Sequence, residues 1–298
     1  MPAAGTLGVS LIRFSPHRLG LDGAYRFVQF RASSCNIEQS HQAKATVLTA
    51  QRKKLILARL AQDGQVIAKD LAGEWGVSED TIRRDLRELA ARGRLQRVHG
   101  GALPASLADG NLQVRESVSV REKVALGRTA AALIQTGQVV ILDGGTTAIQ
   151  VARHLAPDLK ATLITHSPNV AVELAAHPGI EIVMLGGRLF RHSMVNVGAA
   201  MIDGASKVRA DIYFMGVTGV HPKAGLSTGD AEEAAVKRAL HERSAETIVL
   251  ASSEKLLAAS AFVVAPLTEV AAVVVPASAP ARKISPIRVC GLKVVRAR

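Results

Sequence analysis

The chain has 298 residues, 48% of them hydrophobic and 21% charged, which is the composition of a globular protein with room for about two domains. Its 37 basic and 25 acidic residues give a net charge of +12, which favours a polyanionic partner or an anionic membrane surface. The two cysteines, far apart in sequence, argue against a disulfide framework or a CxxC metal site. No apolar run reaches the ~20 residues that span a bilayer, and the start lacks a secretory signal pattern, so we expect a cytoplasmic protein without a membrane segment.

Residues 1–46 show no helical or strand period. We interpret them as a poorly ordered tail or a misassigned start, and place a first domain at 47–103. This domain is expected to open with a helix over 48–61. A shorter helix follows over 65–76, where Ile67, Leu71 and Trp75 recur at i, i+4 and i+8 and Gly76 ends the pattern.

The next helix begins at Ser78, a good N-cap residue, and can end at Gly93. Ile82, Leu86 and Leu89 recur at i, i+4 and i+7 and form one apolar stripe. Arginines lie on the opposite arc of the helix. Two helices joined by a tight glycine turn form a helix-turn-helix, whose second helix enters a DNA major groove.

A basic strand and loop over 94–102 resemble a wing that touches the adjacent DNA backbone. The alternative is a solvated helix with charge pairs such as Arg84 with Glu88. The order of helix, turn, arginine helix and wing favours DNA binding. The candidate DNA-contacting residues on the helix and wing are Ser78, Thr81, Arg83, Arg84, Arg87, Arg94, Arg97 and His99.

Residues 104–120 are expected to form a linker, and from 121 to 298 short apolar runs alternate with amphipathic segments. This alternation predicts an α/β domain with a mostly parallel sheet covered on both faces. The predicted helices are 122–135, 147–155, 168–176 and 230–243. The predicted strands are 139–142, 162–165, 181–185, 212–215, 247–250 and 272–275.

Four of these strands are followed by loops rich in glycine, serine or threonine. Ligands bind beyond the carboxyl ends of parallel strands, and a glycine loop before a helix N-terminus favours an anion. Each loop alone is better explained as a turn that needs positive φ. Together the loops indicate a small-ligand site. Lys237 and Arg238 are expected to be solvated.

The sequence T-I-R-R-D-L-R-E-L followed by R-V-H-G-G-A resembles the DNA-binding domain of the DeoR family of bacterial transcriptional regulators. The motifs L-D-G-G-T-T, M-L-G-G-R, F-M-G-V-T-G and E-E-A-A-V-K-R look like the effector domain of that family. The resemblance covers about 48–296. It implies a fold related to ribose-phosphate isomerases and glucosamine-phosphate deaminases, and effectors that are phosphorylated sugars or related intermediates.

Carried onto this chain, the resemblance implies a set of effector contacts in the loops and on the helix over 230–243. They are Asp143, Gly145, Thr146, Thr147, Ser167, Gly186, Gly187, Arg188, Glu233 and Lys255. Two positions depart from the family pattern. His166 stands where many members have an amide, and Ser252 stands where many have a carboxylate.

We therefore expect a homo-oligomeric repressor of sugar or polyol catabolism, which binds a double-stranded operator and is released by a phosphorylated sugar. No cofactor, metal or catalytic residue is predicted. The alternative is a sugar-phosphate isomerase or deaminase with an added DNA-binding domain. An isomerase needs a general base near the substrate, and the candidates are Asp143, Glu233 and Lys255.

Overall fold

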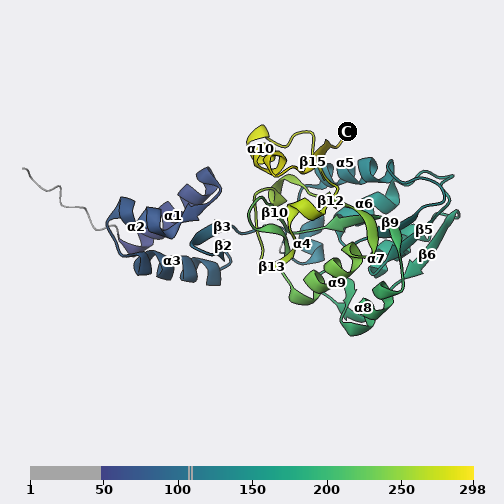
Figure 1. Cartoon of the computed structure of the whole chain (residues 1–298), viewed down its shortest axis with the longest axis horizontal. Coiled ribbons are helices and arrows are strands. Elements are labelled where there is room, and N and C mark those ends of the chain that lie inside the picture. Colours follow the sequence, from purple (N-terminus) through teal and green to yellow (C-terminus); the bar gives the residue numbers. More distant parts are fainter. Residues whose placement is uncertain (1–47, 107, 109) are drawn as a thin grey trace, which may run out of the picture. The chain divides into compact units, whose positions relative to one another are not determined.

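The computed structural model describes residues 48–106, 108 and 110–298. The tail predicted over 1–46 lies outside the described residues. A helix-turn-helix domain comes first, and an α/β domain follows it (Figure 1). The first domain consists of α1 (Thr49–Asp63), β1 (Val66–Ile67), α2 (Ala68–Trp75), α3 (Glu79–Ala91), β2 (Leu95–Val98) and β3 (Gly101–Pro104).

The predicted start of α3 is confirmed, because the Ser78 hydroxyl accepts a hydrogen bond from the Thr81 amide at 3.2 Å. Gly76 ends α2 in the left-handed conformation, as its place between two helices predicts. The prediction for Ile67 was wrong. It lies in β1, pairs with Gly101 and is 45% exposed, because the strand that precedes α2 completes the wing sheet.

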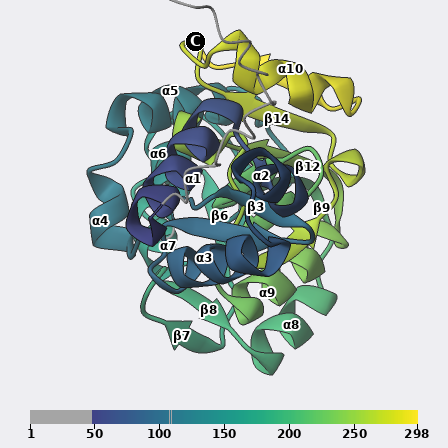
Figure 2. The same cartoon turned by 90° about the vertical axis from the view of Figure 1, so that its left-hand side faces the viewer.

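The three helices lie around the wing strand β3 (Figure 2). Together with the wing they share one apolar core. Ile56 of α1, Leu71 of α2 and Ile82 of α3 are buried in it, which confirms the predicted packing of these helices. A buried ion pair joins α1 to α3, with Arg52 Nε 2.5 Å from the carboxylate of Asp85. The helix that carries the outward arginines is thus fixed by apolar packing and by one buried charge pair.

The α/β domain is built on a seven-stranded, fully parallel sheet with the order β15-β14-β12-β9-β4-β5-β6. All six predicted strands belong to this sheet. The strands are β4 (Val139–Leu142), β5 (Ala161–Thr165), β6 (Ile180–Met184), β9 (Ala210–Gly216), β12 (Ser244–Leu250), β14 (Ala272–Val275) and β15 (Lys293–Arg296).

Helices cover both faces of the sheet, as the apolar strands predict. Alternate residues of a strand point to opposite faces. Tyr213 of β9 therefore packs with α8, α9 and α10, whereas its neighbour Phe214 packs with α5, α6 and α7. The helices are α5 (Val120–Ala131), α6 (Thr146–Arg153), α7 (Pro168–Leu174), α8 (Ala199–Ser206), α9 (Ala231–His241) and α10 (Ala281–Val289).

Smaller elements complete the domain. A hairpin pairs β7 (Arg188–Phe190) with β8 (Val195–Val197), and a second sheet joins β10 (Gly219–His221), β11 (Gly225–Thr228) and β13 (Phe262–Ala265). Two 3-10 helices, η2 (Ser253–Lys255) and η3 (Leu267–Glu269), lie beside β12 and β14 in sequence. The stretch expected as a linker contains a helix, α4 (Leu112–Glu116).

Candidate functional site

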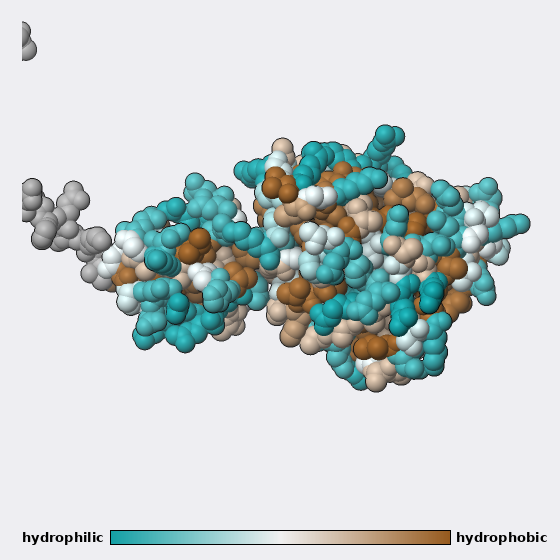
Figure 3. Space-filling model, in the orientation of Figure 1, coloured by the Kyte–Doolittle hydropathy of each residue, from teal (hydrophilic) through white to brown (hydrophobic). Residues whose placement is uncertain are grey.

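The outer face of α3 and the wing form a basic surface. Arg83 is 56% exposed and pairs with Glu79 at 2.7 Å, one turn earlier on the same helix. Most of the visible surface of this domain is hydrophilic (Figure 3). The other candidate side chains that are exposed here are Arg84, Arg87, Arg94, Arg97 and His99.

The remaining two candidates, Ser78 and Thr81, lie at the N-terminus of α3. Their hydroxyl oxygens are 2.8 Å apart, and the Ser78 hydroxyl also accepts the Thr81 amide. A helix N-terminus presents amide donors and a positive dipole end, which suits a phosphate of the DNA backbone. The two hydroxyls fix this helix end and lie beside the arginines that follow.

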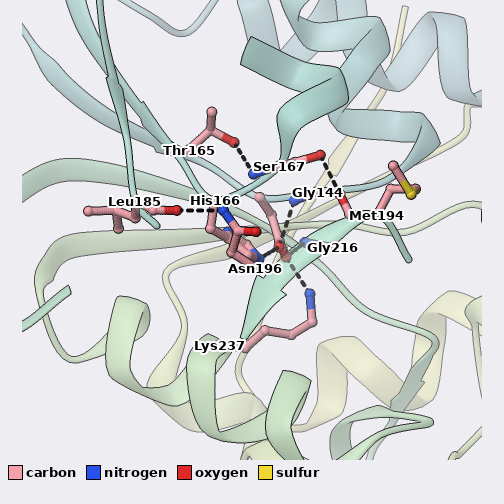
Figure 4. A network of polar contacts seen from close by, with 10 residues as sticks. Gly144, Thr165, His166, Ser167, Leu185, Met194, Asn196, Gly216 and Lys237 are labelled. Carbon is pink, nitrogen blue, oxygen red and sulfur yellow. Dashed lines mark hydrogen bonds and ion pairs between the residues drawn. The ribbon is translucent and has the colours of Figure 1, made fainter. Parts of the chain in front are cut away.

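In the α/β domain, a buried ionic network lies at the carboxyl ends of β4 and β9. The carboxylate of Asp143 accepts the Lys237 ammonium at 2.6 Å, the Gly216 amide at 2.7 Å and the Gly144 amide at 2.8 Å. In Figure 4 the ammonium of Lys237 points from α9 toward the glycines of these strand ends. Burial alone would raise the pKa of Asp143, but Lys237 and the other partners hold it below its ordinary value.

His166 lies on the other side of Asp143, with Nε2 3.5 Å from its carboxylate. Burial lowers the pKa of His166 to about 4, so its ring is neutral at physiological pH. Its backbone carbonyl accepts the Asn196 amide at 2.8 Å, which ties the end of β5 to β8. His166 thus packs as a buried neutral ring beneath the loops.

Two further cations lie beside the start of α6: Arg115 lines a cavity with Gly145, and Lys123 lines another with Thr146. Lys255 interacts electrostatically with both. Burial lowers the pKa of Lys255 to about 8; Glu254 opposes this shift, and Lys123, Arg115 and Lys237 add to it. Burial, and then Arg115, likewise lower the pKa of Lys123, although Glu254 opposes them. An anion bound beside these buried lysines stabilises their charged form, so the cluster suits an anion.

The start of α6 faces this cluster with groups suited to an anion. Gly145 has φ of 97° as the N-cap, a conformation that glycine adopts without strain. Thr147 is 5% exposed, and its hydroxyl has no hydrogen-bond partner among the described residues. Amide donors at a helix N-terminus beside several cations form a phosphate-binding arrangement.

Two adjacent cavities open over the Asp143–Lys237 pair. The inner one, of about 30 Å³, is lined by Gly145, Lys237 and Glu233 among others. The outer one, of about 300 Å³, shares Arg115 and Glu233 with it and adds Asp230 and His192. The larger volume is at the lower end of the range for small-ligand pockets.

The structure brings part of the predicted effector set to these cavities. Glu233 lines both cavities, Gly145 lines the inner one, and Asp143 lies buried beneath, bonded to the lining residue Lys237. Thr146 lines a different cavity beside α7. Ser167 is buried and donates to the Met194 carbonyl at 3.0 Å.

Three other predicted residues lie at the turn between β6 and β7 and are not among the described residues that line the two cavities. Arg188 pairs with Glu232 at the surface. A Cβ on Gly187 would lie 2.8 Å from the Val197 carbonyl, so Gly187 serves close packing of the hairpin. Gly186 precedes it and is exposed.

Some residues escaped the sequence analysis. Lys237 was expected to be solvated, which is wrong: it is 5% exposed and bonded to Asp143. Its place on the inner side of α9, one turn after Glu233, could have indicated this. Arg115 and Lys123 were not identified because the stretch around them was taken as a linker and an ordinary helix.

Comparison with known proteins gives the family. The model of the DeoR-like helix-turn-helix domain matches residues 52–106, and that of the DeoR C terminal sensor domain matches residues 118–276. The chain belongs to the DeoR family. Residues of its sensor domain line most of the two cavities and include Lys123, Lys237 and Lys255.

Relatives named as transcriptional repressors align over most of the chain. A putative aga operon transcriptional repressor of Escherichia coli O157:H7 is 30% identical over 87% of this chain and 98% of its own length. The glycerol-3-phosphate regulon repressor of Escherichia coli K12 is 32% identical over 69% of this chain and 82% of its own length. The transcriptional repressor GlcR of Bacillus subtilis is 34% identical over 74% of this chain and 85% of its own length.

Proposed function

We propose that this protein is a sequence-specific transcriptional repressor of sugar or polyol catabolism genes, released from its operator by a phosphorylated sugar. The observation that carries this proposal is that Arg115 and Lys123 lie beside the start of α6, in a chain that also has an exposed arginine helix. One domain suits the phosphates and bases of DNA, and the other suits a small phosphorylated ligand.

On DNA, α3 enters the major groove and the wing contacts the backbone. Arg84 and Arg87 are exposed and pair with no described carboxylate, so their guanidinium groups are available for guanine O6 and N7. Arg94, Arg97 and His99 bind phosphates on either side. A two-fold oligomer places two such helices on paired half-sites.

In the sensor domain, the phosphate of the effector binds at the N-terminus of α6, near Lys123 and Lys255. The Thr147 hydroxyl lies in this first turn and supplies a further donor. The sugar extends into the adjoining cavities, where the Glu233 carboxylate accepts hydrogen bonds from its hydroxyls. Asp143 acts indirectly, because it holds Lys237 in the floor of the inner cavity.

Turnover of the sugar is not part of this proposal. An isomerase or deaminase requires a general base within hydrogen-bond reach of the reacting carbon. Asp143 is fully buried and bonded to Lys237, so its carboxylate is sequestered. The named relatives are transcriptional repressors, which supports a regulatory role. Such a role places the protein in the cytoplasm.

No helix among the described residues is long and apolar enough to span a membrane.

The test of the proposed function is to incubate the full chain with fragments of DNA from its own genome and to sequence the retained fragments. A regulator retains a few sites that share a repeated motif. If no motif is enriched and all fragments are released to the same extent as the salt concentration rises, the chain binds DNA through charge only. That result would overturn the proposal.

A further inference from the structure

The stretch between the two family matches contains a helix that touches the sensor cavities. This stretch runs from 107 to 117, and α4 lies within it. Asn111 caps α4, since its side-chain oxygen accepts the Val114 amide at 2.9 Å. Leu112 is buried, and its amide donates to the His192 carbonyl at 2.9 Å. Because His192 lines the outer cavity, α4 is anchored to the rim of that cavity.

Arg115 extends from α4 into the ligand region. It lines both cavities, and a Cβ added to Gly145 would lie 3.7 Å from its Nη1 atom. The Arg115 guanidinium therefore reaches the N-cap of α6, where the phosphate is proposed to bind. A guanidinium presents several N–H donors in a plane and binds phosphate in a bidentate manner.

The backbone of Arg115 is tied to the same cluster. Lys123, on α5, donates its ammonium to the Arg115 carbonyl at 2.5 Å. An anion bound at this site competes with the Arg115 carbonyl for the Lys123 ammonium. The guanidinium of Arg115 attracts the same anion. A bound anion therefore acts on α4 through the backbone carbonyl and the side chain of Arg115.

The connection between α4 and α5 has a strained residue. Ser119 has φ of 52°, which is the left-handed region that L-residues rarely adopt. Its hydroxyl donates to Glu254 at 2.8 Å, and Glu254 is the residue before Lys255. Glu254 also accepts the Ser252 hydroxyl at 2.5 Å. This strained position is thus held in place by the segment that carries Lys255, one of the two lysines proposed to bind the phosphate.

We propose that Arg115 is an effector-contacting residue, and that α4 changes position when the phosphate is bound. Because α4 precedes the sensor match and follows the helix-turn-helix match, its movement is transmitted along the chain toward the DNA-binding domain. This inference rests on the proposed phosphate site. It adds that the connecting segment is itself part of the effector site.

Hydrogen exchange of the full chain, with and without inorganic phosphate, tests the proposal. Phosphate slows amide exchange in the peptide covering 143–150 and changes exchange in the peptide covering 111–117. If 143–150 is protected and 111–117 is unchanged, the role of α4 is overturned while the phosphate site stands. If 143–150 is unchanged, the phosphate site itself fails, and the role of α4 fails with it.

Variants separate contact from folding. Arg115→Gln weakens phosphate binding about tenfold to a hundredfold, because it removes a charged bidentate donor. Arg115→Gln also abolishes the effect of phosphate on amide exchange in the peptide covering 111–117. Arg121→Gln removes the same charge from an exposed position on α5 and leaves both effects intact. Equal responses of the two variants would overturn the assignment of Arg115. The exchange pattern of the wild-type protein tests the role of α4 by itself, because it does not depend on whether either variant folds.

Discussion

Lys237 and Asp143 form an ion pair of 2.6 Å with side chains that are only 6% and 1% exposed. The pair joins α9 to the end of β4, beneath the cavities. Removal of one partner leaves the other charge buried and uncompensated. Lys237→Met should therefore lower the free energy of unfolding by about 3–5 kcal/mol.

Urea denaturation of Lys237→Met measures this loss. The matched control is Lys207→Met, which breaks a 2.7 Å pair with Asp203 whose side chains are 70% and 66% exposed. Exposed pairs contribute about 0–1 kcal/mol. A similar small change in both variants would show that the buried pair does not stabilise the sensor domain.

The Arg52–Asp85 pair should stabilise the DNA-binding domain in the same way. Asp85→Ala leaves the Arg52 guanidinium buried without its carboxylate, and we expect a loss of about 3–5 kcal/mol together with loss of DNA binding. Native-state hydrogen exchange locates the loss in α1 and α3. Asp63→Ala, which breaks an exposed pair with Arg59, is the control and should change little. Unaltered exchange in Asp85→Ala would contradict the expectation.

Arg84 and Arg87 should contribute to DNA affinity without contributing to stability, since both are exposed. We expect Arg84→Ala to weaken operator binding by about 1–3 kcal/mol and to relax selection at one base position. Fluorescence anisotropy with operator variants measures both effects. Arg209→Ala removes an exposed arginine of the sensor domain and serves as the control for charge. Full binding by Arg84→Ala would refute its place in the groove.

Effector binding should weaken as pH rises above about 8, because the pKa of Lys255 is lowered to about 8 by burial and by neighbouring cations. A phosphate binds the protonated lysine, so affinity is high below this pKa and falls above it by up to about tenfold per pH unit. The effector phosphate stays dianionic in this range, since its second pKa is about 6. Calorimetry from pH 7 to about 9.5 follows the decline. Lys255→Arg keeps the charge and should flatten the profile; an unchanged slope would exclude Lys255 as the titrating group.

The sequence was sufficient for the architecture. The apolar runs 139–142 and 272–275 match β4 and β14 residue for residue, because strands covered on both faces need apolar side chains at every position. The cap at Ser78 and the stripe through Ile82 were equally local signals. Short elements such as β1 and α4 were missed because two to five residues carry too little periodicity.

The site was less accessible to sequence reasoning. Whether a charged residue faces solvent or a buried partner depends on which elements meet in space. Lys237 is separated from Asp143 by 94 residues, and Arg52 from Asp85 by 33. Arg115 lies in a stretch whose composition suggested a linker. The loops that follow parallel strands led to the region of the two cavities, but did not distinguish Gly145, which lines a cavity, from Gly187, which lies under a hairpin.

The most direct test of the whole account is a titration of the protein bound to its selected operator with paired sugars and sugar phosphates. We predict that at least one phosphorylated sugar releases the operator, and that its unphosphorylated form does not. The Lys123→Gln and Lys255→Gln variants should require about tenfold or more of the same compound, since each loses one charged hydrogen bond to the phosphate. If both variants respond like the wild-type protein, or if the sugar acts as well as its phosphate, the sensor domain does not read a phosphate at this site.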